Sequence, residues 1–190
     1  AFYSCSSLTS INLPALTTIS SSAFYSCSSL TSINLPALTT ISSSAFYSCS
    51  SLTSINLPAL TTISSSSAFQ YCYSLTSINL PALTTISSSA FYSCSSLVSF
   101  LFYNTFTSLL QPQQFTGCVN LKDLQLVSNW RWSLNVKDTD LTHECIIDMF
   151  NKLKDLTGED SLTLTIGATN LAKVTDEELQ IPNSKNWTVQ

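Results

Sequence analysis

The first 121 residues of this 190-residue chain contain no Asp, Glu, Lys, Arg or His. All 11 acidic and 7 basic residues therefore lie in the C-terminal third. A protein that binds nucleic acid needs basic side chains against the phosphates, so the composition excludes that class. With 44% apolar and 9% charged residues, the chain also lacks the composition of a disordered segment.

Long apolar runs are also missing, because Ser, Thr and Asn interrupt every apolar stretch after a few residues. A transmembrane helix needs about 20 apolar residues, so the sequence predicts no membrane insertion. The chain opens on Ala1 within a repeat and shows no signal peptide. If the protein is exported, we expect its signal to lie upstream of Ala1.

The chain is built instead from a repeat of 22 residues. Residues 1–22 read AFYSCSSLTSINLPALTTISSS and recur unchanged at 23–44 and 45–66. After the additional Ser67 comes a variant copy at residues 68–89. A fifth copy starts at residue 90 and then departs from the pattern, and a sixth is recognisable at residues 114–126. This period predicts a solenoid in which each coil contacts only its neighbours.

Each copy predicts one short strand and a return path. Ile11 and Leu13 alternate with Ser10 and Asn12, so the apolar pair should face inward and the polar pair outward. Pro14 has no backbone N–H and ends the strand. A single coil would leave its strand edges unpaired, so we expect the copies to stack as parallel strands about 4.8 Å apart.

The string AFxxCxxLxxIxLPxxLxxI, over residues 1 to about 126, resembles the BspA-like leucine-rich repeat. That family occurs mainly in surface proteins of bacteria and of some parasitic protists. The resemblance implies a mainly β solenoid of about six coils over residues 1–136. The string departs from the commoner LxxLxLxxNxL pattern, because the usual Asn position holds Leu16, Leu38, Leu60 and Leu83. Ser and Thr hydroxyls, abundant in every copy, are the expected substitutes for satisfying the turn backbone.

The chain has seven cysteines, and six of them share one repeat position: Cys5, Cys27, Cys49, Cys72, Cys94 and Cys118. Equivalent side chains in stacked strands lie about 4.8 Å apart, farther than the ~3.8 Å between Cβ atoms in a disulfide. We therefore expect a buried row of free thiols that pack as small hydrophobes. No metal site is expected, because the chain has no CxxC pair and one histidine, His143.

Residues 137–190 are predicted to form a small α+β cap on the solenoid. The predicted helix covers 141–156, with Asp140 or Thr142 as its N-cap and Gly158 just past its end. Its apolar face consists of Ile146, Met149, Phe150 and Leu153. Residues 141–189 also resemble a C-terminal segment that follows such repeats in proteins of gut Firmicutes and their phages. That resemblance implies a cap and carries no known activity.

Three shorter elements are predicted after that helix. The alternation over 161–166 favours a strand. Thr175 and Glu178 form a capping box that opens a short helix, which Pro182 closes from behind. Residues 187–189 are predicted to add a final strand.

No motif for catalysis or cofactor binding is present. Any serine could be combined with His143 and Asp140 or Asp148, but serine is too common here to carry information. The chain has no GxSxG elbow, and its three glycines form no phosphate loop. The sequence therefore predicts a non-enzymatic protein with no catalytic, metal or cofactor-binding residues.

The candidate binding face is the outward side of the strands, which we call the strand face. It consists of Ser10, Asn12, Ser32, Asn34, Ser54, Asn56, Ser77 and Asn79. These uncharged donors and acceptors suit a sugar or an extended peptide; alternatively, they keep the sheet hydrated and bind nothing. In the fifth copy Leu101 breaks the columns, and Phe102 and Tyr103 follow, either as core or as a binding patch.

The sequence is compatible with two functions from different classes. The resemblance implies an extracellular or cell-surface binding and adhesion module, with a protein or glycan partner on a host or neighbouring cell. The alternative is a structural spacer, a stalk or a phage fibre segment, with variable repeat number and no ligand. The strand edge at Ala1 has no cap in this sequence, so we expect either upstream residues or a second chain, through self-association, to cover it.

Overall fold

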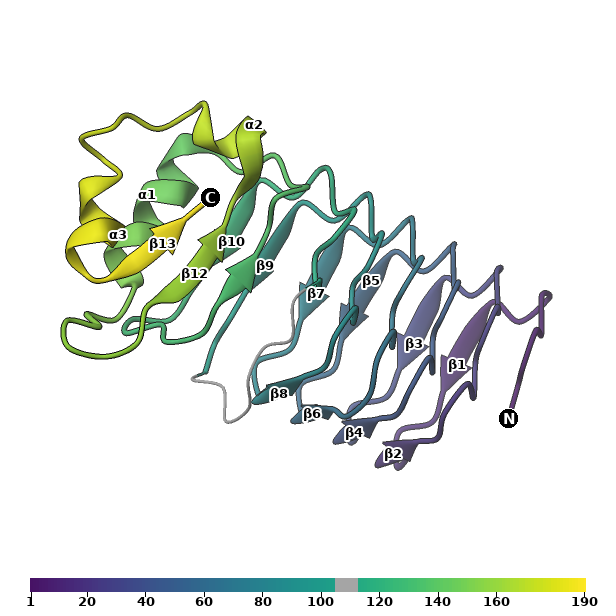
Figure 1. The fold of residues 1–190 in the computed structure, drawn as a ribbon. Helices are drawn as coiled ribbons and strands as arrows, with labels where there is room; N and C mark the ends of the chain where they lie inside the picture. The colour runs from purple at the N-terminus through teal and green to yellow at the C-terminus, as the bar shows by residue number, and fades with distance from the viewer. Residues whose placement is uncertain (105–112) are drawn as a thin grey trace.

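Each 22-residue copy forms one coil, and its Ser-Ile-Asn triplet is a strand. The computed structural model describes residues 1–104 and 113–190. The triplets are β1 (Ser10–Asn12), β3 (Ser32–Asn34), β5 (Ser54–Asn56) and β7 (Ser77–Asn79), continued by β9 (Ser99–Leu101) and β10 (Asp123–Gln125). They lie side by side along the solenoid (Figure 1). Within the pairs β1–β3, β5–β7 and β9–β10 the strands are parallel and in register.

The predicted alternation is confirmed in the inner coils. Leu35 and Leu57, each following its strand, are fully buried, whereas the Ser and Asn of each triplet are exposed. In the first coil Ile11 is buried but Leu13 remains 40% exposed. Leu13 is more exposed than Leu35 and Leu57 because a neighbouring coil covers it on one side only.

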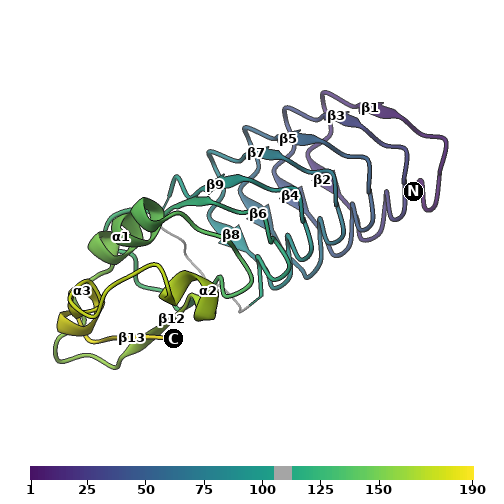
Figure 2. The same ribbon diagram turned by 90° about the horizontal axis from the view of Figure 1, so that it is seen from above.

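A second row of strands was not predicted. It comprises β2 (Thr18–Ile19), β4 (Thr40–Ile41), β6 (Thr62–Ile63) and β8 (Thr85–Ile86), which form one parallel four-stranded sheet. Figure 2 shows this row opposite the first, across the interior of the coils. Two residues are too few to show an alternating pattern, so the pairing appears only when the coils are stacked.

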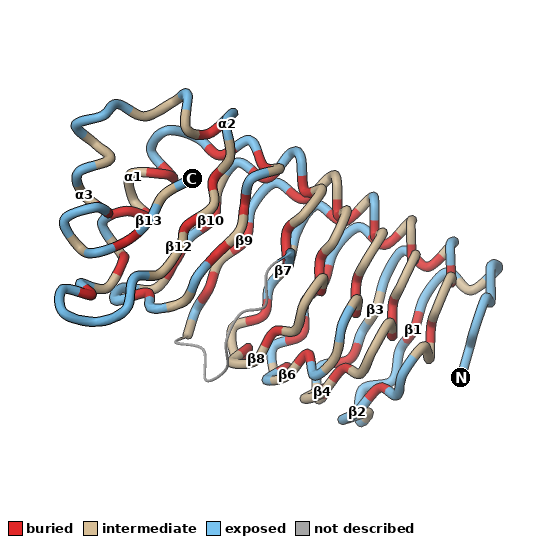
Figure 3. The backbone as a smooth tube through the Cα atoms, in the orientation of Figure 1, coloured by how far each residue is buried: buried red, intermediate tan, exposed pale blue. Residues whose placement is uncertain are grey.

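The core consists of columns of equivalent side chains along the solenoid. The rings of Phe24, Phe46, Phe69, Phe91 and Phe115 are buried, and successive centroids lie 5.2 to 6.0 Å apart in stacked geometry. Phe2 continues this column but is 47% exposed. The tube in Figure 3 shows the same gradient, with little burial in the first coil and regular burial in the coils that follow.

The cap contains three helices and three short strands. They are β11 (Leu134–Asn135), α1 (His143–Lys152), β12 (Leu162–Thr165), α2 (Gly167–Leu171), α3 (Gln180–Ser184) and β13 (Trp187–Val189). The strands form a separate parallel sheet in the order β11-β12-β13. Because β11 pairs with β12, the chain begins to build this sheet before residue 136; the predicted division at that residue stays a prediction.

Helix α1 has one of the two predicted N-caps and the predicted apolar face except Leu153, but it ends earlier than predicted. Thr142 is its N-cap, accepting a hydrogen bond from the Cys145 N–H at 3.1 Å, whereas Asp140 instead pairs with Lys173. The prediction that the helix runs to residue 156, just before Gly158, is wrong. Leu153 is extended and forms a bridge with Trp130, which ends the helix at Lys152.

The later elements of the cap follow the sequence more closely. Strand β12 and strand β13 are confirmed. The capping box is also present, because the Thr175 N–H donates to Glu178 Oε2 at 2.8 Å and the Glu178 N–H donates to Thr175 Oγ1 at 3.2 Å. The prediction that this box opens the helix is wrong, because residues 176–179 form turns and α3 begins at Gln180. Pro182, predicted to stand behind the helix, lies buried inside α3. Its missing N–H is tolerated because it falls in the first turn of that helix.

Candidate functional site

The structure places all eight predicted residues of the strand face on the solvent side of four consecutive strands. Each of the Ser and Asn side chains in β1, β3, β5 and β7 is exposed. Equivalent residues stand directly opposite one another, Asn12 against Asn34 and Asn56 against Asn79. The result is a flat, uncharged surface with two columns of short polar side chains.

The asparagines of this face bind one another in pairs. Asn34 Nδ2 donates to Asn12 Oδ1 at 2.8 Å, and Asn79 Nδ2 donates to Asn56 Oδ1 at 2.9 Å. These bonds hold the amide groups in a fixed orientation. Each pair also uses one donor and one acceptor internally, which reduces the number of polar groups that a ligand could contact.

The threonine that precedes each strand is also engaged with the neighbouring coil. Thr31 Oγ1 donates to the Thr9 carbonyl at 3.0 Å, and Thr76 Oγ1 donates to the Thr53 carbonyl at 3.1 Å. This agrees with the expectation that hydroxyls substitute for the usual ladder asparagine. These hydroxyls bind backbone carbonyls next to the strands, and not only in the turns. Their acceptor lone pairs remain on the surface.

The strand face changes character at its C-terminal end. Leu101 is half-buried in β9, and Asp123 in β10 brings the first carboxylate of the chain onto the sheet. Phe102 is buried, with its ring centroid 4.9 Å from that of Trp130, and so belongs to the core. Tyr103 is exposed, and its hydroxyl donates to Asn79 Oδ1 at 3.0 Å. The two aromatic residues therefore have different roles.

The repeat cysteines form a row of free thiols, and five of the six are fully buried. Each buried Sγ donates to the carbonyl of a phenylalanine in the preceding coil, as Cys49 does to Phe24 at 3.2 Å. Burial raises the pKa of Cys49 and of Cys118 to about 12. Cys5 is the exception to the predicted buried row: it is exposed because no coil covers it on that side.

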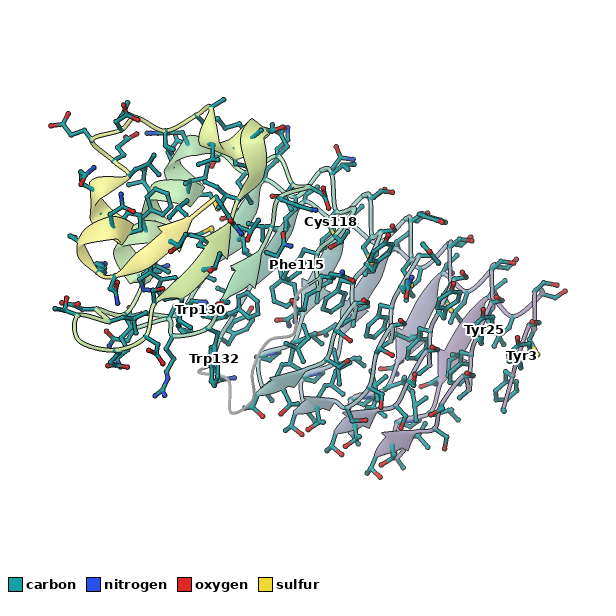
Figure 4. All side chains as sticks on the ribbon, in the orientation of Figure 1. Tyr3, Tyr25, Phe115, Cys118, Trp130 and Trp132 are labelled. Atoms are coloured by element: carbon teal, nitrogen blue, oxygen red, sulfur yellow. The ribbon has the colours of Figure 1, made fainter. Side chains whose placement is uncertain are left out.

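A column of tyrosines on the surface was missed in the sequence analysis. Its members are Tyr3, Tyr25, Tyr47, Tyr71, Tyr73 and Tyr92, linked by ring contacts between 4.6 and 5.8 Å. Figure 4 shows Tyr3 and Tyr25 on adjacent coils. The signal was present in the sequence as a tyrosine at the third position of most copies. These tyrosines lie outside the buried apolar positions that define the coil, so the pattern of core residues does not predict the column.

The cap carries a hollow of about 370 Å³ between charged and aromatic side chains. Its lining includes Arg131, Trp132, Lys154 and Glu159, of which Lys154 and Glu159 are ion-paired. Arg131 lies over the Trp132 ring at 5.7 Å. Over residues 1–104 and 113–190, no group of three His, Cys, Asp or Glu side chains is arranged to hold a metal ion.

None of the helices in the described part of the chain has the length and apolar content that crossing a bilayer requires. The longest, α1, has ten residues.

The fold is shared with solved bacterial proteins. A leucine-rich repeat protein of Treponema pallidum superposes with a TM-score of 0.67 at 23% identity, over 95% of this chain and 85% of that one. A leucine-rich repeat protein of Bacteroides ovatus gives a TM-score of 0.52 at 19% identity, over 86% of this chain and 45% of that one. At these identities the likeness concerns the fold alone. Curated protein sequences gave no match.

The repeat itself carries a more specific match. A family model described as the BspA type leucine rich repeat region matches six copies over residues 1–131. That span includes the four coils that present the strand face and the strands β9 and β10 at its C-terminal margin. With its period, its stacked phenylalanines and its parallel strands all in agreement, the chain belongs to the BspA-type leucine-rich repeat family.

Proposed function

We propose that this chain is a non-enzymatic binding or adhesion module displayed at a cell surface, and that the strand face contacts the ligand. The observation that carries the proposal is the set of eight exposed, uncharged Ser and Asn side chains on four coils, in register within the pairs β1–β3 and β5–β7. Membership of a repeat family typical of surface proteins supports the location.

The chemistry of the face favours an uncharged ligand with repeated hydrogen-bonding groups. A glycan or the backbone of an extended protein segment offers donors and acceptors at intervals, so that many weak contacts add up along the columns. The face has no charge up to Asp123, so salt should change the affinity little.

An array of glycans and matrix proteins, probed with the whole chain, tests this proposal. A captured ligand should lose its affinity when Asn34→Arg and Asn56→Arg are combined, because both side chains are exposed on adjacent coils. Ser28→Arg, on an exposed turn of the same coil, is the matched control. Binding that survives the double substitution would remove the strand face from consideration.

A structural spacer or fibre segment is the second candidate, and the asparagine pairs favour it. Amides that bind each other and threonines that bind the neighbouring backbone stabilise a stack without any ligand. Three identical copies also allow the length to change by whole coils. This candidate predicts no ligand on the arrays and full retention of folding when copies are added.

End-to-end association belongs to the spacer candidate. The first coil exposes Phe2 and Leu13 beside an apolar hollow of about 170 Å³. Sedimentation of the chain and of a Leu13→Ser variant would separate the cases: association that depends on Leu13 supports a fibre, and a monomer at all concentrations argues against it.

A further inference from the structure

The tyrosine column places six of the seven tyrosines of the chain in one continuous series of ring contacts. The rings of Tyr3, Tyr25 and Tyr47 stack nearly parallel, with centroids 4.9 and 4.6 Å apart and interplanar angles of 4° and 5°. The seventh tyrosine, Tyr103, lies apart from the column with its hydroxyl on Asn79. Tyr103 can therefore serve as a reference for a phenol outside the column.

The fourth coil departs from the repeat and yet keeps the column continuous. Gln70 replaces the tyrosine of the third position, and the next residue, Tyr71, supplies a ring from a backbone with φ 63°. That ring stands almost perpendicular to Tyr47 and to Tyr92, at 83° and 89°, with centroids 5.2 and 5.8 Å away. The edge of one phenol thus meets the face of the next.

The column is open to solvent, unlike the phenylalanine column behind it. Tyr3 is 60% exposed and Tyr73 is 48% exposed, while Tyr25 and Tyr47 are half-buried. Burial raises the pKa of the Tyr47 phenol, and the neighbouring hydroxyls of Tyr25 and Tyr71 raise it further. The Tyr47 phenol is therefore protonated at physiological pH. The exposed rings of Tyr3 and Tyr73 are accessible to a reagent in solution.

We propose that the tyrosine column is a site of oxidative cross-linking, at which a peroxide-activated one-electron oxidant joins neighbouring tyrosines of one chain as dityrosine. Each of two phenols loses one electron and one proton and becomes a phenoxyl radical. The two radicals form a carbon–carbon bond between the ring positions next to the hydroxyls, and the ring hydrogens there move to the oxygens. The two electrons and two protons reduce one hydrogen peroxide to two waters.

Proximity decides which phenols react with each other. Two radicals on adjacent coils are held in or near contact, which gives an effective concentration far above that of two chains in dilute solution. Rotations about the side-chain torsions bring ring edges together, since Tyr3 and Tyr73 are exposed and Tyr25 and Tyr47 are only partly buried. The bond would tie consecutive coils covalently along the surface. It does not depend on the proposed ligand, because the strand face lies at other positions of the repeat.

The buried thiols do not compete for the oxidant. Cys27, Cys49 and Cys72 have no exposed surface, and only Cys5 among the cysteines is exposed. A Cys5→Ser background therefore leaves the phenols as the oxidisable groups at the surface of the repeats. Intact mass reports the outcome, since each cross-link removes two hydrogens and adds no atom.

The test treats dilute Cys5→Ser protein with a haem peroxidase and hydrogen peroxide. We expect dityrosine fluorescence in the monomeric fraction, and a loss of two hydrogens for each bond. Replacing Tyr25, Tyr47 and Tyr71 together by phenylalanine keeps the rings and removes the hydroxyls. This change should lower the yield within one chain by roughly tenfold, because the contacts that hold the phenols together are lost.

Two controls make the result decisive. Tyr103→Phe should leave the yield unchanged, and protein unfolded in urea should give less product within one chain. Circular dichroism of each variant verifies that the coils remain folded. An unchanged yield in the triple variant, equal participation of Tyr103, or cross-links only between chains would overturn the proposal.

Discussion

Serine adopts positive φ at two positions of the coil, a conformation that usually requires glycine. Ser4, Ser26 and Ser48 have φ of 54° to 55°, at a cost of about 1–2 kcal/mol relative to the right-handed region. The structure shows what offsets it: the Ser26 N–H donates to the Tyr47 carbonyl of the next coil at 2.7 Å, as Ser4 does to Tyr25. No glycine occurs before Gly117, so bonds between coils, rather than glycine, maintain these turns.

Two glycines of the cap both have positive φ, but only one of them also lies in close contact with its surroundings. Gly167 has φ 76°, and an added Cβ would lie 2.6 Å from the Lys137 carbonyl oxygen. Gly158 has φ 84° with nothing within 4 Å of that position. We expect Gly158→Ala to lower the free energy of unfolding by about 1–2 kcal/mol. Gly167→Ala should lower it by that amount and by about 1–3 kcal/mol more, because the added Cβ overpacks the site.

Urea unfolding followed by tryptophan fluorescence measures both variants, because Trp187 is buried in the cap. Equal losses in the two variants would show that the backbone near Lys137 moves aside at no cost.

The exposed thiol of the first coil should react alone in the native protein. Of the seven free cysteines, only Cys5 is exposed. With a disulfide reagent at neutral pH we expect one fast equivalent in native protein and seven in denaturant, and Cys5→Ser should remove the fast equivalent. Two or more fast equivalents would mean that the coils open readily.

The buried thiols should make stability fall at alkaline pH. The pKa of Cys49 and of Cys118 is about 12 in the folded protein, against an ordinary value of 9.0. The unfolded chain therefore loses these protons first, so the stabilising contribution is complete below about pH 9 and is lost as the pH rises toward 12. Each thiol can contribute a slope of up to about 1.4 kcal/mol per pH unit.

Urea midpoints from pH 8 to 11, compared with those of a Cys49→Ala, Cys118→Ala variant, isolate this contribution, since the two proteins differ only in these two thiols. The variant should be less stable at pH 8 but should show a shallower decline. Parallel curves would contradict the assignment.

At the scale of elements, the sequence indicates which faces are buried better than it indicates where elements end. The spacing of Ile146, Met149 and Phe150 predicted the buried face of α1 correctly, because helical periodicity is a local property. Its C-terminus depends on Leu153, which leaves the helix to pair with Trp130, a residue 23 positions earlier. No local pattern could report that pairing.

The end of α1 is stabilised by a lysine that follows α3. Lys185 Nζ donates to the carbonyls of Phe150, Asn151 and Leu153 at 2.9 to 3.2 Å. A cation at the C-terminus of a helix satisfies its last carbonyls and the helix dipole. We expect Lys185→Met to lower the stability by about 1.5–3 kcal/mol.

Far-ultraviolet circular dichroism during urea unfolding provides the measurement, and Lys122→Met, at an exposed lysine outside the cap, is the matched control. A Lys185→Met loss no larger than that of the control would show that solvent satisfies these carbonyls equally well.

At the scale of the whole molecule, stability depends on how many coils are stacked. Removing residues 23–44 joins two identical copies and preserves every type of contact between coils. We expect the shortened chain to fold with the same circular dichroism spectrum, a slightly lower melting temperature, and a length reduced by about 4.8 Å.

Removing residues 23–33 is the matched control, since half a copy places apolar positions of one coil against polar positions of the next. That protein should fail to fold. Small-angle scattering and thermal melts distinguish the two deletions, and a full-copy deletion that unfolds would show that the coils are not equivalent.

The repeat in the sequence determined the solenoid, the parallel strands and the outward placement of Ser10, Asn12 and their equivalents, because period and alternation are properties of neighbouring residues. The stacked structure alone decided the rest: the second row of strands, the pairing of Asn12 with Asn34, the exposure of Cys5 and the tyrosine column. Each of these depends on which atoms of one coil meet the next, 22 residues away, and that contact exists only once the coils are stacked.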